Sequence, residues 1–448
     1  MHHIIQMDLS ATTSQTRFTL DELVLKIREL FTQQGMAAVA NLILKLVDEL
    51  LAIGHTTGTL SPAQQRPCPC GQGRYELKDR LQRSVRTSIG TLHLAWRRLR
   101  CRHCQKTFVP LRQFLGLEAW QRKTSELEQV AVEVVSEQNY RRASRHLDVV
   151  GQIPVPKSTL HRWVVDSQAS QWELPEAQPP VLMADSTGYK RRPQSAAQRT
   201  NAGELRVVVG RRADGKWVPY GAWSGQSWAE IGQALRGSGP QPALQAQVLV
   251  SDGEQGLARA LASLANRQQR CGWHVAYELP VMLWHDQAPS RQRRIHTAPL
   301  AQLVGIELPA GDLEALRPED KAAVKERVAA AQDGLRQLVR QLLAKGYEKA
   351  AHYIQSAQDK LFSYVEFWLE TGVVCPRTTS FLERLMRELG RRLKRIAFGW
   401  SETGAAQVAR LILRRIVDPD EWQSYWKQRL GLNDNVHLAL RAVKTLKA

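Results

Sequence analysis

Long hydrophobic runs are missing from this chain, and acidic residues are scarce relative to basic ones. No apolar run approaches the roughly 20 residues that a bilayer-spanning helix needs, and no lipidation motif is present, which argues against a membrane protein. The N-terminus lacks the basic segment, apolar core and cleavage site of a signal peptide, so we expect a cytoplasmic protein. The 448 residues include 62 Lys and Arg against 43 Asp and Glu, a formal net charge of +19. Such a charge attracts polyanions, most commonly nucleic acid, and predicts association with the nucleoid.

Cysteine is also uncommon, but four of the six cysteines form two close pairs. The pairs are Cys68 with Cys70 and Cys101 with Cys104. In a chain without an export signal, close pairs indicate metal binding rather than disulfides. Because residues 75–100 between them alternate like strands, we expect a zinc-ribbon-like module with a structural Zn²⁺; buried reduced thiols are the alternative. The first pair is separated by one residue instead of two, which leaves room for His103 or another ligand.

Two stretches in the N-terminal part predict DNA contacts. Basic residues around the second cysteine pair suit phosphates, although a solvated charge run would look the same; they are Arg97, Arg98, Arg100, Arg102 and Lys106. Residues 126–166 resemble a helix-turn-helix whose last helix, 159–166, is capped by Ser158. Leu160, Trp163 and Val164 would face inward, although small helical hairpins are common and the motif alone does not decide. The side chains left to enter a DNA groove are Lys157, Thr159, His161 and Arg162.

Two short apolar runs each end in an aspartate. Residues 181–184 precede Asp185, and residues 246–251 precede Asp252. Apolar runs of this length are typical of buried strands. Residues 204–212 and 216–223 flank an Ala-Asp-Gly turn and predict a hairpin beside the first run. Two strand-end carboxylates on one mixed sheet indicate a metal-dependent site, unless each aspartate merely caps a following helix.

The remaining elements surround a third acid. Cys271 and His274 have ligand-like spacing within a predicted strand, 269–275, but two residues cannot make a structural zinc site alone. Residues 278–371 have a helical, polar pattern. A helix capped by Thr379 or Ser380 then carries Glu383 in its first turn, where a carboxylate also suits the helix dipole. Basic side chains of this helix predict phosphate contacts; they are Arg384, Arg387, Arg391 and Arg392.

In this order, the motifs resemble the Mutator-like superfamily of DDE transposases encoded by bacterial insertion sequences. The resemblance covers most of the chain from Cys68 to about Arg414, including Trp400-Ser401 and Gly404-Ala405, which are similar to one branch. It implies an α/β, ribonuclease H-like core with an all-helical insertion between the fifth strand and the final catalytic helix. Two departures are Ser380, where the family usually has Asn, and the tight first cysteine pair.

The resemblance also assigns roles to the candidate residues. Asp185, Asp252 and Glu383 match the DDE acids, and Cys271 with His274 matches the C-x-x-H signature of the superfamily. Carboxylates suit Mg²⁺ or Mn²⁺, and two such ions roughly 3.5–4 Å apart can promote phosphodiester cleavage. We expect Asp185 to bridge both ions, with each of the other acids completing one. The four paired cysteines would hold Zn²⁺.

The sequence therefore predicts a transposase that binds terminal inverted repeats, cleaves DNA and transfers strands as a homodimer or higher oligomer. A DNA-binding regulator with an inactive core and a ribonuclease H-like nuclease without joining activity are the alternatives. We expect an N-terminal helical region, a zinc-ribbon-like module, a helix-turn-helix domain, a first core part, a helical insertion and a final catalytic helix with C-terminal helices. Their boundaries are 1–60, 61–115, 120–170, 180–277, 278–375 and 376–448.

Overall fold

The computed structural model describes residues 35–60, 68, 70–71, 73–171, 178–193, 202–237, 244–310, 313–394 and 399–431, with isolated residues 24, 28 and 31. The chain divides into two compact units, residues 1–135 with 140–163 and residues 136–139 with 164–448. Most of residues 1–34, the first part of the predicted N-terminal helical region, and residues 172–177 lie outside the described residues. In the part that is described, no helix has both the length and the apolar character needed to cross a membrane.

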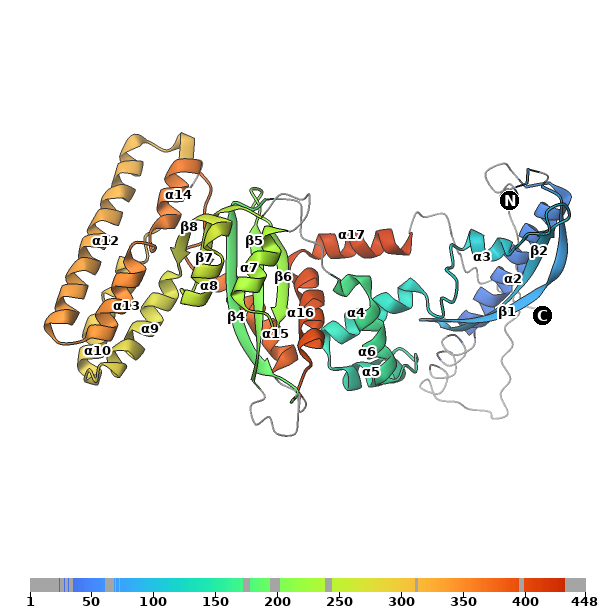
Figure 1. Cartoon of the computed structure of the whole chain (residues 1–448), viewed down its shortest axis with the longest axis horizontal. Coiled ribbons are helices and arrows are strands. Elements are labelled where there is room, and N and C mark those ends of the chain that lie inside the picture. Colours follow the sequence, from blue (N-terminus) through green and yellow to red (C-terminus); the bar gives the residue numbers. More distant parts are fainter. Residues whose placement is uncertain are drawn as a thin grey trace, which may run out of the picture. The chain divides into compact units, whose positions relative to one another are not determined.

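The first unit contains a small antiparallel sheet covered by a helix (Figure 1). Strands β1 (Tyr75–Thr87) and β2 (Gly90–Cys101) pair along almost their whole length, and β3 (Thr107–Phe108) pairs with the end of β2. Helix α2 (Met36–Thr57) packs on β2, and the short α3 (Pro110–Phe114) closes the cluster. Their shared core contains Leu51, Val85, Leu94, Trp96 and Leu111. The predicted strands between the cysteine pairs are thus confirmed.

Three helices follow where the helix-turn-helix was predicted. They are α4 (Ser125–Glu137), α5 (Tyr140–Val149) and α6 (Lys157–Asp166). Helix α6 begins before Ser158, so the prediction that Ser158 caps it is wrong. The helical turn already starts at Pro156, whose carbonyl accepts hydrogen bonds from the backbone N–H of Thr159 and Leu160. Leu160 and Val164 are fully buried and Trp163 is half-buried, as expected.

The second unit is built on a mixed five-stranded sheet with the order β6-β5-β4-β7-β8. The strands are β4 (Val181–Lys190), β5 (Ala202–Arg211), β6 (Trp217–Ser224), β7 (Ala246–Ser251) and β8 (Ala265–Arg270). The first three are antiparallel neighbours, whereas β7 and β8 run parallel to β4. The predicted hairpin is present, and Gly215 supplies the left-handed residue of its turn with φ +82°. The fold class is therefore α/β.

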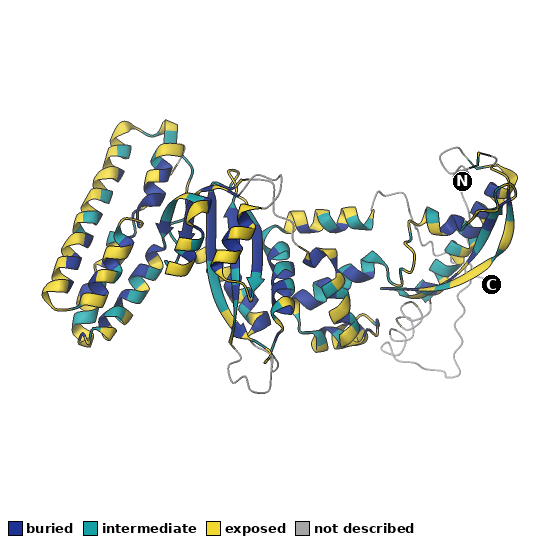
Figure 2. Cartoon of the chain, viewed as in Figure 1, coloured by how far each residue is buried: buried dark blue, intermediate teal, exposed yellow. Residues whose placement is uncertain are grey.

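Helices pack against this sheet, and its strands are largely buried (Figure 2). The core under α7 (Trp228–Arg236) and α8 (Gln255–Ala260) includes Leu182 and Ala184 of β4. Because side chains alternate along a strand, Met183 and Asp185 point to the opposite face. Helix α15 (Ser380–Leu393) contacts β4, and α16 (Glu402–Val417) contacts β5 and β6. Ser401 caps α16, its hydroxyl accepting from the Gly404 N–H.

A helical segment separates β8 from α15, as the sequence predicted. Its main helices are α9 (Gly272–His285), α10 (Ser290–Thr297), α11 (Leu300–Leu303), α12 (Pro318–Ala344), α13 (Glu348–Gln358) and α14 (Ser363–Thr371). The last described helix is α17 (Pro419–Leu430). The prediction of a strand through 275 is wrong, because β8 ends at Arg270. From there the buried apolar residues Val275, Leu279 and Leu283 recur every four positions, which is the period of a helix.

Candidate functional site

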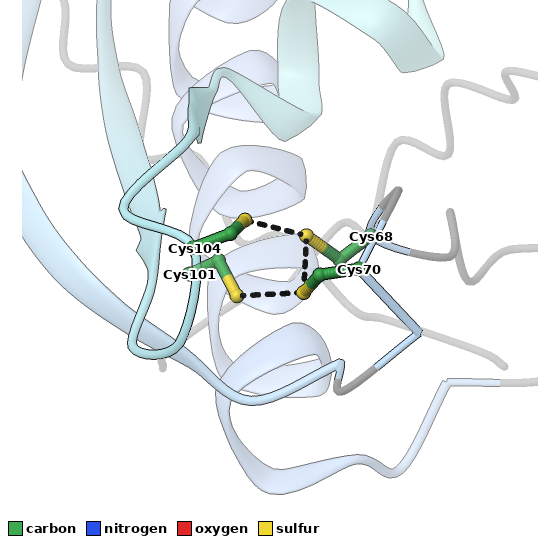
Figure 3. A group of neighbouring side chains, drawn as sticks. All are labelled: Cys68, Cys70, Cys101 and Cys104. Atoms are coloured by element: carbon green, nitrogen blue, oxygen red, sulfur yellow. Dashed lines mark hydrogen bonds between the residues drawn. The ribbon is translucent and has the colours of Figure 1, made fainter.

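The four paired cysteines converge on one point of the first unit (Figure 3). Their sulfur atoms all lie within 4.8 Å of one another. The Sγ–Sγ distances are 3.2 Å for Cys68 and Cys104, 3.3 Å for Cys68 and Cys70, and 3.6 Å for Cys70 and Cys101. All four are free thiols. A tetrahedral zinc ion with Zn–S bonds of about 2.3 Å would hold sulfurs about 3.8 Å apart, so the cluster is compatible with zinc after a small expansion.

Two tight turns present these sulfurs. The Gly71 N–H donates to the Cys68 carbonyl at 2.8 Å, and Gly71 has a left-handed φ of +74°. In the other turn, the Gln105 N–H donates to the Cys101 carbonyl at 3.0 Å. The backbone N–H of Cys104 contributes most to a lowering of the pKa of Cys101 to about 6, whereas the hydrogen bond with Cys104 raises the pKa of Cys68, so the metal-free cluster favours the thiolate at Cys101. His103 is exposed and outside the group, so the geometry favours four cysteines over the alternative ligand set.

The basic residues beside the cysteines mostly have acidic partners within the same module. Arg97 pairs with the buried Asp48 of α2 at 2.9 Å, and Arg98 pairs with Asp79. Glu76 accepts from Arg100 at 2.5 Å and lies 3.4 Å from Arg102. These partners neutralise much of the local charge. The arrangement therefore favours the alternative, a solvated run of charges, over the predicted contacts with phosphate. The exposed Lys106 remains a candidate for such a contact.

Asp185 lies in β4, and Asp252 directly follows β7, the parallel neighbour of β4. The last parallel pair between β4 and β7 is Met183 with Val250, so the same register continued by two residues sets Asp185 beside Asp252. Asp185 was predicted at the end of its strand, and this is wrong. Strand β4 continues to Lys190, because its antiparallel pairing with β5 extends beyond its pairing with β7. The charge of Asp252 raises the pKa of Asp185, so the two carboxylates belong to one site.

Asp252 lies in a turn whose next residue, Gly253, has a backbone conformation that only glycine adopts without strain. Its Oδ1 accepts from the Glu254 N–H at 2.9 Å, and Glu254 rather than Asp252 occupies the N-cap position of α8. Gly253 has a φ of +91°, and a Cβ there would lie 0.9 Å from Arg270 Nη1. Asp252 is therefore not the helix cap that the alternative interpretation proposed.

The surroundings of Asp185 disfavour ionisation of its carboxyl group. Burial raises the pKa of Asp185 to about 6, and the nearby carboxylates of Asp252 and Glu383 add to the effect. The Ser186 N–H, which donates to Asp185 Oδ1 at 2.7 Å, and the positive charge of His274 act in the opposite direction. A carboxyl that is costly to ionise among other acids gains most from a nearby cation.

Glu383 approaches this site from the first turn of α15, as predicted. Its carboxylate, Cys271 Sγ and a ring nitrogen of His274 all lie within 4.8 Å of one another. Asp185 and Asp252 do not belong to that group, and the three acids form no group of that compactness among the described residues. Glu388, the other acid of α15, instead pairs with Arg391 at 2.7 Å. The geometry thus favours Glu383.

Thr379 is a residue of this site that sequence analysis treated only as a helix cap. It is fully buried at the N-cap position of α15, but its side chain makes no capping hydrogen bond. Its hydroxyl donates to Glu383 Oε1 at 3.1 Å and lies 3.3 Å from His274 Nδ1. Its N–H donates to Cys271 Sγ at 3.3 Å. Thr379 therefore joins the C-x-x-H pair to the acid.

Hydrogen bonds also set the charge state of the C-x-x-H pair. Burial opposes ionisation of the Cys271 thiol, but hydrogen bonds with His274 and Thr379 outweigh it and lower the pKa of Cys271. Burial alone would lower the pKa of His274, yet its hydrogen bond with Cys271 and the charges of Asp252 and Glu383 raise it. Both shifts favour a thiolate beside an imidazolium.

The predicted DNA-contacting side chains are mostly accessible. On α6, Lys157, His161 and Arg162 are exposed and Thr159 is half-buried. On α15, Arg384, Arg387 and Arg391 are exposed. Arg392 is only 5% exposed and lies over the Trp400 ring at 4.7 Å, so the prediction that it contacts phosphates is wrong. The helical period places Arg392 among the buried positions Leu385 and Leu389 rather than with Arg391.

We expect Asp185→Asn to stabilise the metal-free protein at neutral pH. A carboxyl with a raised folded-state pKa binds its proton more tightly when folded, so its contribution to stability falls as pH rises from about 4 to 6. Asparagine avoids this cost and should raise the free energy of unfolding by about 2 kcal/mol at pH 7.5, with about half that gain near pH 5. Urea unfolding at both pH values, with Asp214→Asn in the hairpin turn as control, measures it. A loss of stability at pH 7.5 would contradict the argument.

Thr379→Val should weaken the positioning of Glu383 without removing a ligand. Valine keeps the side-chain shape but cannot donate to Glu383 Oε1, so the carboxylate gains rotational freedom. We expect divalent-metal affinity at the acidic site, measured by titration calorimetry, to fall about tenfold, or ~1.4 kcal/mol. Thr379→Ser restores the hydroxyl and should recover most of it. If both variants lose the same affinity, the hydroxyl has no positioning role.

Comparisons with known proteins do not assign the chain to a family. No protein-family model matches the chain, and none of the curated proteins is significantly similar to it. The site is thus defined by its own geometry: three acids with a thiol and an imidazole on one side of a mixed sheet, and a separate four-cysteine cluster compatible with zinc.

Proposed function

We propose that the chain is a DDE transposase of the Mutator-like type, with a ribonuclease H-like core. The observation that carries the proposal is the convergence of three acids from separate elements. Asp185 lies in β4, Asp252 directly follows β7, the parallel neighbour of β4, and both Asp252 and Glu383 raise the pKa of Asp185. Clustered carboxylates with a perturbed pKa are typical of metal-dependent phosphoryl-transfer sites.

The order of elements supports the core assignment. Five strands form the mixed sheet, a helical segment follows the fifth strand, and the next helix brings Glu383 back against β4. This is the arrangement that the resemblance implies, with the insertion lying between β8 and α15. The C-x-x-H pair, Cys271 and His274, follows β8 directly and faces Glu383.

The donor set suits two hard divalent ions. When bound, Mg²⁺ or Mn²⁺ would neutralise charge on the phosphodiester and activate the attacking water or 3′-hydroxyl. Asp185 would take the bridging position, because the charges of both other acids influence it. Asp252 and Glu383 would each complete one ion. Thr379 would hold the Glu383 carboxylate in place, and Arg384 and Arg387 would bind the DNA backbone near the acids.

The first unit and the helices that adjoin it would supply end recognition. The accessible face of α6 carries Lys157, Thr159, His161 and Arg162, residue types that contact bases and phosphates in the major groove. The zinc-ribbon-like module would add a second contact to the terminal inverted repeat. Since two ends must be joined, we expect the active form to be a homodimer or higher oligomer on DNA.

The test uses labelled DNA carrying the ends of the element that encodes the chain. We expect Mg²⁺- or Mn²⁺-dependent nicks at those ends and joined products in target DNA, both abolished by chelation of the metal. Specific binding without cleavage in either metal would replace the proposal with a DNA-binding regulator. Cleavage without joining would replace it with a nuclease.

Arg162→Ala is expected to weaken binding to terminal-repeat DNA. Arg162 is exposed on α6, and loss of a bidentate base contact costs about 1–3 kcal/mol. Lys325→Ala, which removes one positive charge from the exposed surface of α12, is the matched control and should change binding little. Fluorescence anisotropy at two salt concentrations measures both. Equal losses would mean that Arg162 contributes charge alone.

A further inference from the structure

The C-x-x-H pair and Glu383 offer a donor set that differs from that of the cysteine cluster and from that of the acids. A thiol, an imidazole and a carboxylate lie within 4.8 Å of one another, with Cys271 fully buried and the other two half-buried. We propose that Cys271, His274 and Glu383 bind one zinc-class divalent cation, and that this ion competes with catalytic metal for Glu383. The binding can be measured without any activity, whereas the competition rests on the proposed function.

The backbone holds two of the donors in fixed positions. The Cys271 N–H donates to the Ser251 carbonyl at 2.8 Å, at the end of β7, and the Gly272 N–H donates to the Arg377 carbonyl at 3.1 Å. Cys271 is thus tied both to the sheet and to the segment before α15. His274 follows in the first turn of α9, so the strand-to-helix junction presents a sulfur and a nitrogen to the same side.

Thr379 organises the third donor. Its hydroxyl donates to Glu383 Oε1 and contacts His274 Nδ1, which keeps the carboxylate and the imidazole facing each other. Its N–H donates to Cys271 Sγ and would stabilise a metal-bound thiolate, because hydrogen bonds from outside the ligand set orient ligands and tune their basicity. Donors in a tetrahedral zinc site lie about 3.3–3.8 Å apart. Because the three donors already lie within 4.8 Å of one another, reaching that spacing needs a contraction of at most about 1.5 Å, within reach of two half-buried side chains.

The ligand types select the class of metal. Thiolate and imidazole favour Zn²⁺, Co²⁺ and related ions, whereas Mg²⁺ prefers oxygen donors only. Three protein ligands leave a fourth position open for water or a substrate oxygen, unlike the closed set of four cysteines. Asp185 and Asp252 remain outside this group. The two kinds of metal would therefore meet at one shared ligand, Glu383, and zinc would inhibit a reaction that depends on Mg²⁺.

The test is Co²⁺ titration of the metal-free, full-length protein without Mg²⁺, because Mg²⁺ would compete for Glu383 under this proposal. Binding is followed by thiolate-to-cobalt absorption, which oxygen-only sites do not give. We expect roughly two tightly bound Co²⁺ per chain, one at the cysteine cluster and one at Cys271, His274 and Glu383. Cys271→Ser should retain roughly one, together with the thiolate-to-cobalt absorption of the cysteine cluster. Cys375→Ser is the matched control, because Cys375 is also a buried free thiol but belongs to no donor group.

The outcomes separate this site from the proposed function. Equal Co²⁺ binding by wild type and Cys271→Ser would overturn the proposal. If Cys271→Ser loses its native circular dichroism, His274→Ala takes its place, with the same expected loss of one ion. Asp185→Asn should keep both Co²⁺ ions while losing DNA cleavage. Loss of cleavage in that variant without a second Co²⁺ site would retain the transposase proposal and reject this one.

Discussion

Cleavage of element-end DNA is expected to fall by at least about 10³-fold in Asp185→Asn, or ~4 kcal/mol of transition-state stabilisation. Asp185 is the acid whose pKa both Asp252 and Glu383 raise, so it is the natural bridging ligand. A neutral amide has the same shape but is a poor ligand for two cations. The measurement is the single-turnover rate of nicking in saturating Mn²⁺, with products resolved on a sequencing gel.

Two controls separate chemistry from folding and DNA binding in this experiment. Asp214→Asn makes the same chemical change in the turn between β5 and β6, where Asp214 pairs with Arg212, and should leave the rate unchanged. Terminal-repeat binding by Asp185→Asn should also equal that of wild type, since α6 is unaltered. An active Asp185→Asn enzyme would mean that Asp185 is not a metal ligand.

The two aspartates of the site, Asp185 and Asp252, could be predicted because the pattern that marks them lies within a few residues of each. An apolar run that ends in aspartate marks a buried strand, and both such runs are strands in the structure. What the sequence does not contain is the length over which each strand finds a partner. Strand β4 pairs with β5 along all ten residues but with β7 along only three. Asp185 is therefore within the pairing with β5 but two residues beyond the last pair with β7.

The contacts that complete the site depend on segments far apart in the chain. Thr379 bonds to Cys271 across 108 residues, and the intervening helical segment returns the chain to the sheet. A threonine before a helix is usually a cap, so local reasoning assigns Thr379 to the helix end. Tertiary structure instead turns its hydroxyl toward Glu383 and His274. Arg392 is a similar case, because its neighbour Trp400 belongs to the segment before α16.

The cysteine cluster shows how a spacing anomaly is resolved in three dimensions. The single-residue gap in the first pair leaves room for His103 in place of a cysteine. Instead, Gly71 adopts a left-handed conformation directly after Cys70, and all four sulfurs converge. An aromatic cluster of the buried His55 and Tyr75 with the half-buried Phe108 lies beside them, and Tyr75 packs against Cys68 and Cys101 in one core. Folding of the module and metal binding are therefore expected to be coupled.

Cys101→Ser is accordingly expected to remove zinc from the cluster and to destabilise the module of α2 and β1–β3. The module has a small core, and a structural zinc site contributes about 10 kcal/mol or more of binding energy to folding. Losing one of four ligands should cost on the order of 4 kcal/mol. His103→Ala is the matched control: it changes the exposed residue between Cys101 and Cys104 and should keep both the metal and the stability. Zinc content by mass spectrometry and thermal unfolding with and without a chelator measure the pair. Zinc loss in His103→Ala with retention in Cys101→Ser would reverse the ligand assignment.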